Sequence, residues 1–160
     1  MDNSLLISKY FQAILEESTE IADILDPENA PHIAPSEQVY PVEEEQTKDY
    51  TQRIFPLLQP DNLTFPFIVH SRTGITVEYT KDIEYAPVGW YNIVNYTISC
   101  VSNDYEQCIE LANAVRHAVE TYRWKDENIY IHPIQLLTVS EYTTDNDAFV
   151  EELQFQCMVE

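Results

Sequence analysis

Two kinds of residue are scarce in this 160-residue chain: glycine, with two copies, and basic residues, with eight Lys and Arg against 28 Asp and Glu. Gly74 and Gly89 are too few to build the Gly-rich loops that cradle phosphates in nucleotide-binding proteins. The net charge of -20 argues against binding to nucleic-acid phosphates, because such contacts need Lys and Arg. The negative charge either keeps the protein soluble or belongs to a surface that repels DNA and so lets it pass without binding.

Cysteine is also rare, and the sequence has neither an export signal nor a long apolar run. The three cysteines, Cys100, Cys108 and Cys157, show no C-x-x-C spacing, so we expect buried thiols in a reducing compartment, and neither a disulfide framework nor a zinc site. The N-terminus has no basic leader, and no stretch approaches 18 uninterrupted apolar residues. The sequence therefore predicts a cytosolic chain without a membrane span.

Side chains that could carry out catalysis are present but poorly arranged. Cys108 and His117 are nine residues apart on a predicted helix, which separates them by about 13 Å along the axis. Adjacent acids such as Glu151 and Glu152 point apart on a strand. Asp145, Asn146 and Asp147 lack the remaining residues of a calcium loop and predict a plain turn. We expect no catalytic residue, no metal site and no cofactor, and hence a protein that is not an enzyme.

The N-terminal part predicts one helix followed by an irregular segment. Apolar residues recur at helical spacing over residues 1–26, in a stripe made of Ile7, Phe11, Ile14, Ile21 and Leu25. Asp26 and Pro27 end this pattern. Residues 27–50 are rich in proline and acids, which predicts a loop or arm that either orders against a partner or is a variable surface insertion.

From residue 53 onward the apolar pattern is mainly that of strands. Two strands are expected to meet near Thr73 and Gly74, and a loop over residues 81–90 precedes the strand YNIVNYTISCV. Asn103 is the expected N-cap of a second helix. The residues expected to form the buried stripe of this helix are Cys108, Leu111, Ala112, Val115, Val119 and Tyr122.

Two closing strands follow, joined by a turn over residues 144–147. The order of elements predicts an α+β fold: a mainly antiparallel β-sheet with two α-helices packed on one face and a projecting β-hairpin. We expect a single domain over residues 1–160, with the sheet and the second helix in 53–160.

Aromatic residues are the main indication of a binding surface. Eleven Tyr, six Phe and two Trp exceed what a core of this size hides, and Tyr and Trp are enriched at protein interfaces. The predicted interface is the cluster around the central hairpin loop, formed by Tyr79, Tyr85, Trp90 and Tyr91. The alternative is that these rings only cover the open side of the sheet.

The order of these motifs resembles the tail completion or tail terminator proteins of tailed bacteriophages. The N-terminal helix carries the resemblance together with RIFPLLQPDNLTFPFIVHSR, YTISCVSNDYEQCIELANAVRHAV and the closing LQFQCMV. It covers residues 53–160 best, and it rests on apolar spacing rather than on chemically distinctive residues. The segment 27–48 is longer than the usual link of this family.

The resemblance implies a virion component, assembled in the host cytoplasm, that forms a ring at the head-proximal end of the tail. Such a ring, typically a homohexamer, ends polymerisation of the tail tube protein and joins the tail to the head connector. Its expected partners are copies of itself, the tube protein and neck proteins near the portal, with DNA passing through an acidic channel.

Two other functions remain open on the sequence. One is another neck ring, a stopper or adaptor between portal and tail. The other is an acidic DNA mimic that inhibits a basic host protein, which would use the charge of -20 directly.

Overall fold

The computed structural model describes residues 3–25, 53–57, 64–79, 90–125 and 129–160. A 3-10 helix η1 (Asn3–Leu6) leads into α1 (Ile7–Glu17) and α2 (Thr19–Leu25), and α3 (Tyr105–Thr121) follows later in the chain. The strands are β1 (Ile54–Pro56), β2 (Phe67–Tyr79), β3 (Trp90–Ser102), β4 (Trp124–Lys125), β5 (Tyr130–Ile131), β6 (Gln135–Thr143) and β7 (Phe149–Val159). The predicted arm at 27–50 lies outside the described residues. Among the described helices, none is long and apolar enough to cross a membrane.

The strands form one sheet that is antiparallel except at β1. Their order is β1-β2-β3-β7-β5-β4, and β6 also pairs with β7. The four long strands run in the spatial order β2, β3, β7, β6, and each runs antiparallel to its neighbour. β1 is parallel to β2 and covers only Ile68 to His70 of that strand. The expected α+β fold with a mainly antiparallel sheet is confirmed.

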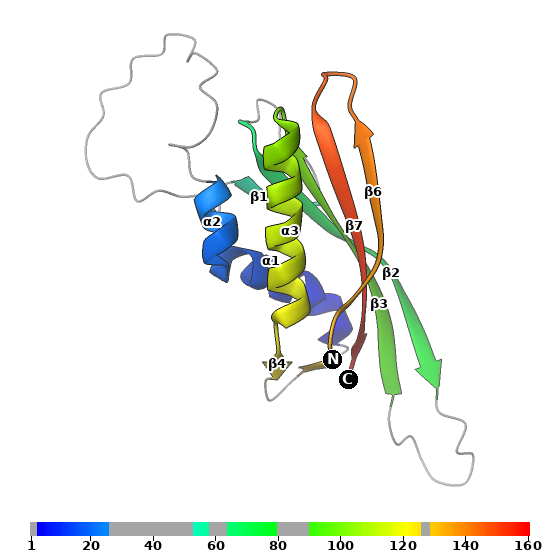
Figure 1. The fold of residues 1–160 in the computed structure, drawn as a ribbon. Helices are drawn as coiled ribbons and strands as arrows, with labels where there is room; N and C mark the ends of the chain where they lie inside the picture. The colour runs from blue at the N-terminus through cyan, green and yellow to red at the C-terminus, as the bar shows by residue number, and fades with distance from the viewer. Residues whose placement is uncertain (1–2, 26–52, 58–63, 80–89, 126–128) are drawn as a thin grey trace, which may run out of the picture.

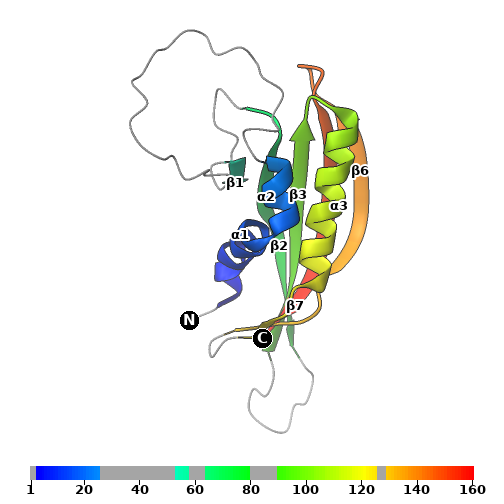
Figure 2. The same ribbon diagram turned by 60° about the vertical axis from the view of Figure 1, so that its left-hand side comes forward.

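All three α-helices lie on one face of this sheet, as the two views in Figures 1 and 2 show. The helix-facing side of β3 carries Val94, Tyr96, Ile98 and Cys100, all buried, as the alternation predicts. Phe11 of α1 stacks on Tyr96, with ring centroids 3.8 Å apart. The main core therefore lies between the helices and the sheet.

The second helix matches its predicted stripe and differs at its cap. Cys108, Leu111, Ala112, Val115 and Val119 are buried, and Tyr122 is half-buried against the core. The N-cap is Asp104 rather than Asn103, and its side chain accepts a hydrogen bond from the backbone N of Glu106. The helix begins at Tyr105, and Asp104 directly before it has the extended backbone that an N-cap residue adopts.

The predicted N-terminal helix is wrong in one respect, because it is two helices. Ser18 has an extended backbone between α1 and α2. Its hydroxyl oxygen accepts a hydrogen bond from the backbone N of Ile21, as an N-cap residue does. The break still leaves Ile21 and Leu25 buried together with Ile7, Phe11 and Ile14.

The expected turn at Thr73 and Gly74 is also wrong, because β2 is one continuous strand of 13 residues. The pairing of β2 with β3 shifts register between Arg72 and Gly74, which marks a β-bulge. Glycine is favoured at such irregular positions of a strand as well as in turns, so its presence alone predicted the wrong feature. The turn between β6 and β7 is confirmed, since Thr144 N donates to Ala148 O at 2.9 Å.

Candidate functional site

Three of the four residues predicted as an interface lie at the far end of the β2–β3 pair. Tyr79 pairs with Trp90 and Glu78 pairs with Tyr91 at the end of the ladder. Tyr85 lies outside the described residues, and for Tyr79 and Trp90 the backbone alone is described. Tyr91 is half-buried. The fold thus brings three of the four positions together, and their role as an interface stays a prediction.

Large apolar side chains that are exposed gather at two opposite edges of the sheet, as the strand order shows. We call the first the β6 edge; it comprises Tyr105, Leu137, Val139 and Tyr142. We call the second the β2 edge; it comprises Leu5, Leu6, Leu57 and Val77. Exposed apolar residues on the outer strands of a sheet are candidates for contacts with another chain.

The β6 edge is formed by a strand that is exposed along most of its length. Leu137 and Val139 are 53% and 49% exposed, and among the described residues β6 pairs with β7 alone. β6 contains no proline, no lysine and one charged residue, Glu141. Soluble proteins commonly protect such edges with prolines, charges or bulges. β6 has one irregularity, between Leu136 and Thr138.

The β2 edge differs in composition and in what surrounds it. The 3-10 helix η1 lies beside it, where the Arg72 side chain donates a hydrogen bond to Leu5 O at 3.2 Å. β1 covers β2 as far as His70, so the strand from residue 71 to 79 has no described partner on this side. Val77 is exposed on this stretch. Both edges therefore offer backbone that an added strand could pair with.

The two edges also differ in charge. The C-terminal segment 135–160, which includes β6 and β7, contains six acidic residues and no Lys or Arg. Five Lys and Arg have described side chains. Arg72 belongs to β2, while Lys9 of α1 and Arg53, just before β1, belong to segments that neighbour β2. In a chain with a net charge of -20, this gives the β6 side an acidic character and the β2 edge its few cations.

A pair of carboxyl groups lies where β6, β7 and α3 meet. Glu141 and Glu151 are register partners, and Tyr105 donates its hydroxyl hydrogen to Glu141, with O–O distances of 3.0 and 3.2 Å. Burial, then a hydrogen bond with Glu141 and its negative charge, raise the pKa of Glu151 to about 7. Glu151 is therefore partly protonated near neutral pH. This cluster ties the edge strand to the start of α3.

A second polar network is buried between α1 and the sheet. His70 is 1% exposed; its Nδ1 lies 2.6 Å from the Tyr96 hydroxyl and its Nε2 lies 2.5 Å from Gln12 Oε1. Gln12 Nε2 in turn donates to Glu16 at 2.6 Å. Since Gln12 Oε1 can only accept, His70 Nε2 carries the proton and Nδ1 accepts from Tyr96. Burial lowers the pKa of His70 to about 4, so the imidazole is neutral at pH 7.

The thiols are buried, as predicted, and are not placed for nucleophilic chemistry. Cys108 Sγ donates to Cys100 O at 3.3 Å and to Phe149 O at 3.4 Å. Burial is the main reason that the pKa of Cys108 rises to about 11, which leaves the thiol protonated. His117 is exposed on the other side of α3 and pairs with Glu20 at 3.3 Å.

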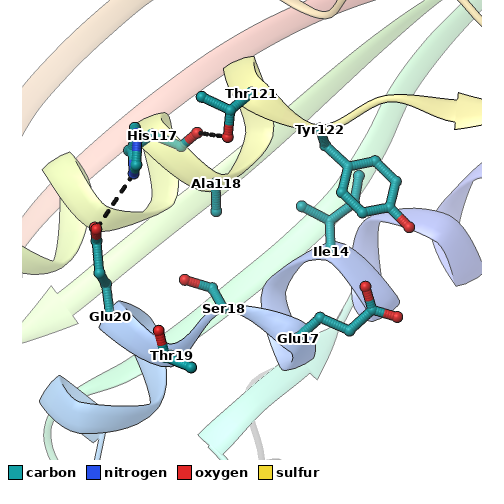
Figure 3. Close-up of a pocket in the computed structure, with 9 residues that line it drawn as sticks. All are labelled: Ile14, Glu17, Ser18, Thr19, Glu20, His117, Ala118, Thr121 and Tyr122. Atoms are coloured by element: carbon teal, nitrogen blue, oxygen red, sulfur yellow. Dashed lines mark hydrogen bonds and ion pairs between the residues drawn. The ribbon is translucent and has the colours of Figure 1, made fainter.

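His117 and Glu20 belong to a shallow pocket of about 300 Å³ between the α1–α2 junction and the end of α3, drawn in Figure 3. Its other lining residues are Ile14, Glu17, Ser18, Thr19, Ala118, Thr121 and Tyr122. His117 Nδ1 and Glu20 Oε1, 3.3 Å apart, link α3 to α2 at the pocket. Among the described residues, no group of His, Cys, Asp or Glu is arranged to hold a metal ion.

The face of the sheet opposite the helices, which we call the open face, is nearly uncharged among the described side chains. It is mainly polar, although Val69, Ile93 and Met158 also belong to it by register. Its central residues are amides and hydroxyls: Ser71, Asn95, Thr97, Ser99, Thr138, Ser140, Gln154 and Gln156. Gln156 donates to Asn95 Oδ1 at 3.0 Å across the β3–β7 pair. Glu152 is the one charged side chain described on this face. A small apolar cluster of Phe67, Val101, Ala148 and Val150 covers one end.

No family model and no curated protein matches this sequence. A solved structure does share the fold: it is a chain from the virion of a native gene transfer agent (GTA) particle, with a TM-score of 0.62 and 13% sequence identity. The match covers 94% of this chain and 91% of that chain. At this identity the likeness shows a common fold, which extends over nearly the whole of both chains.

Proposed function

We propose that this chain is a structural protein of a tailed bacteriophage or phage-like particle. The observation that carries the proposal is the fold shared with a virion chain over nearly the full length of both proteins. The sequence resemblance to tail terminator proteins points to the same class independently of the fold comparison. A chain of this class assembles with copies of itself and other virion proteins rather than catalysing a reaction.

Within the particle, we propose a ring at the head-proximal end of the tail, typically of six copies, that ends tube polymerisation and contacts the head connector. Two features support a ring. The β6 edge and the β2 edge both expose apolar side chains, and they are different surfaces. Contact between two different surfaces of identical copies gives a ring when the rotation closes.

The same arrangement supports a channel for DNA. Three helices cover one face of the sheet, and in a ring joined through sheet edges this bulkier layer fits on the outside, where the circumference is larger. The open face then lines the channel, with no described Lys or Arg to hold phosphates and with Glu152 in every copy. DNA would therefore pass a polar wall with a ring of carboxylates.

The experiment that tests this function is tail tube assembly in the presence of the chain. Tube protein encoded by the same phage or prophage is polymerised with and without the purified chain, and tube lengths are measured by electron microscopy. We expect shorter tubes with the chain at one end. Tubes of unchanged length without bound chain would refute the proposed function.

The same assay separates a terminator from another neck ring. A stopper or adaptor would bind to finished tails without changing the lengths of growing tubes. A DNA mimic would leave both tubes and tails free of the chain and would instead bind a basic host protein in a salt-sensitive manner.

A further inference from the structure

We propose that copies of this chain join head to tail by strand addition, with the β6 edge of one copy placed against the β2 edge of the next. This contact would join neighbouring copies in the proposed ring, and it rests on that proposed function. Its partner is a second copy of the same chain. Three properties of the two edges lead to it: their apolar residues, the lengths and directions of their strands, and their charges.

The first property is that both edges expose apolar side chains to solvent. Nine large apolar side chains are exposed among the residues that the structure describes; eight of them belong to the β6 edge or the β2 edge, and the ninth is Tyr130 of β5. A contact between the two edges would cover Leu137 and Val139 from one copy and Leu5 and Val77 from the other. Burial of such apolar area is the main driving force in most associations of proteins.

The strands of the two edges match in length and direction. β6 has nine residues, and the uncovered part of β2, from residue 71 to 79, also has nine. Because β2, β3, β7 and β6 alternate in direction, β2 of a similarly oriented copy beside β6 continues the antiparallel alternation. Neither stretch contains proline, so each residue whose backbone faces outwards keeps its N–H.

Charge favours contact between unlike edges over contact between like edges. Two β6 edges would bring together Glu141 and the other acids of the segment 135–160, where no Lys or Arg offsets them. A β2 edge instead offers Arg72, with Lys9 and Arg53 on neighbouring elements. The uncovered stretch of β2 contains Arg72 and Glu78, so its formal charges balance. The head-to-tail contact therefore avoids the repulsion between acids that a contact of two β6 edges would bring.

Cross-linking of introduced cysteines tests this contact. Ser140 of β6 and Thr76 of β2 are exposed, and both belong to the open face. The three native cysteines are buried, so a bis-maleimide reagent would react mainly with the introduced thiols. The variants are S140C, T76C and the double variant, each cross-linked in the purified full chain over a range of concentrations up to its solubility limit.

We expect the double variant to give a ladder of dimers and higher oligomers, while each single variant alone stays monomeric. An equimolar mixture of the two single variants should stop at dimers. Dimers formed by S140C alone would indicate a β6–β6 contact and overturn the inference. A double variant that remains monomeric at every concentration would overturn it as well.

Val139→Lys in the double cysteine background tests the edge itself. A lysine on an edge strand opposes the addition of another strand. We expect loss of the ladder. Asn113→Lys, at an exposed position of α3 away from both edges, adds the same charge and should leave the ladder unchanged. Equal circular dichroism and unfolding midpoints would establish that both variants are folded.

The inference and the proposed function fail in different ways. If the chain shortens tail tubes but gives no head-to-tail ladder, the contact proposed here is wrong and the function stands. If the ladder forms but the chain never binds tubes or tails, the contact stands and the proposed function is wrong.

Discussion

The two faces of the sheet differ in what they hold and in what covers them. The helix-covered face carries a continuous apolar core with a buried histidine network, whereas the open face carries amides and hydroxyls around Glu152. On this account the covered face determines stability, and the open face with its two edges determines assembly. Substitutions on the two faces should therefore affect different measurements.

The largest expected effect on stability comes from Phe11, which is fully buried and stacked on Tyr96. Phe11→Ala should lower the free energy of unfolding by about 3 to 5 kcal/mol, because it removes buried area and leaves a cavity. Ser99→Ala on the open face should change it by less than about 0.5 kcal/mol. Urea unfolding measures both; similar losses for the two variants would contradict the division between the faces.

Lowering the pH should reduce the free energy of unfolding because His70, on the covered face, is buried in its neutral form. The pKa of His70 is about 4 in the folded chain because of burial, against 6.5 for an unperturbed histidine, so the unfolded chain binds the proton first as pH falls. The stability contributed by the neutral imidazole is complete above pH 6.5 and is lost as pH falls towards 4. The loss approaches about 3 kcal/mol, since each pKa unit corresponds to about 1.4 kcal/mol.

His70→Gln should flatten this part of the pH profile of unfolding, even though it lowers stability at pH 7. Exposed His117 offers the matched control, since His117→Gln should leave the acid slope as it is in the parent chain. An unchanged slope in His70→Gln would show that His70 is not responsible for it.

Raising the pH should reduce the free energy of unfolding by a smaller amount, because Glu151 of β7, the register partner of Glu141 in β6, loses its proton. The pKa of Glu151 is raised from 4.5 to about 7, so the folded chain holds the proton more tightly. The resulting stability is complete below pH 4.5 and is lost as pH rises through 7. Glu151→Gln should therefore raise the free energy of unfolding at pH 8 by about 1 to 2 kcal/mol, a range that allows for solvent screening at exposed Glu141.

Thermal unfolding at pH 5 and pH 8 measures the Glu151 effect. Glu152→Gln is the control, because Glu152 is the neighbouring acid on the opposite face of the same strand. A stabilisation by Glu152→Gln at pH 8 as large as that of Glu151→Gln would indicate general relief of negative charge rather than an effect of the raised pKa of Glu151.

The sequence predicted the elements whose patterns are local. The stripe from Cys108 to Val119 and the alternation of Val94, Tyr96, Ile98 and Cys100 both indicated the buried side correctly. Each pattern depends on the period of a single element, which tertiary contacts did not override.

Features that depend on pairing between distant residues were not predictable in the same way. Glu141 and Glu151 become partners through the register of β6 and β7, and the charge pattern along one strand does not contain that register. His70 meets Gln12 only because α1 lies over β2. Gly74 indicated an irregularity of the chain, and only its pairing with Asn95 shows that the irregularity is a bulge within one strand.

The most direct measurement is a reconstruction, at side-chain resolution, of the head-proximal tail end in particles that contain this chain. The account predicts a closed ring in which β6 of each copy lies beside β2 of the next, with helices outside and the open face towards the DNA. Particles without the chain at that end would contradict the proposed function. A ring joined through the helices, with both sheet edges uncovered, would contradict the contact.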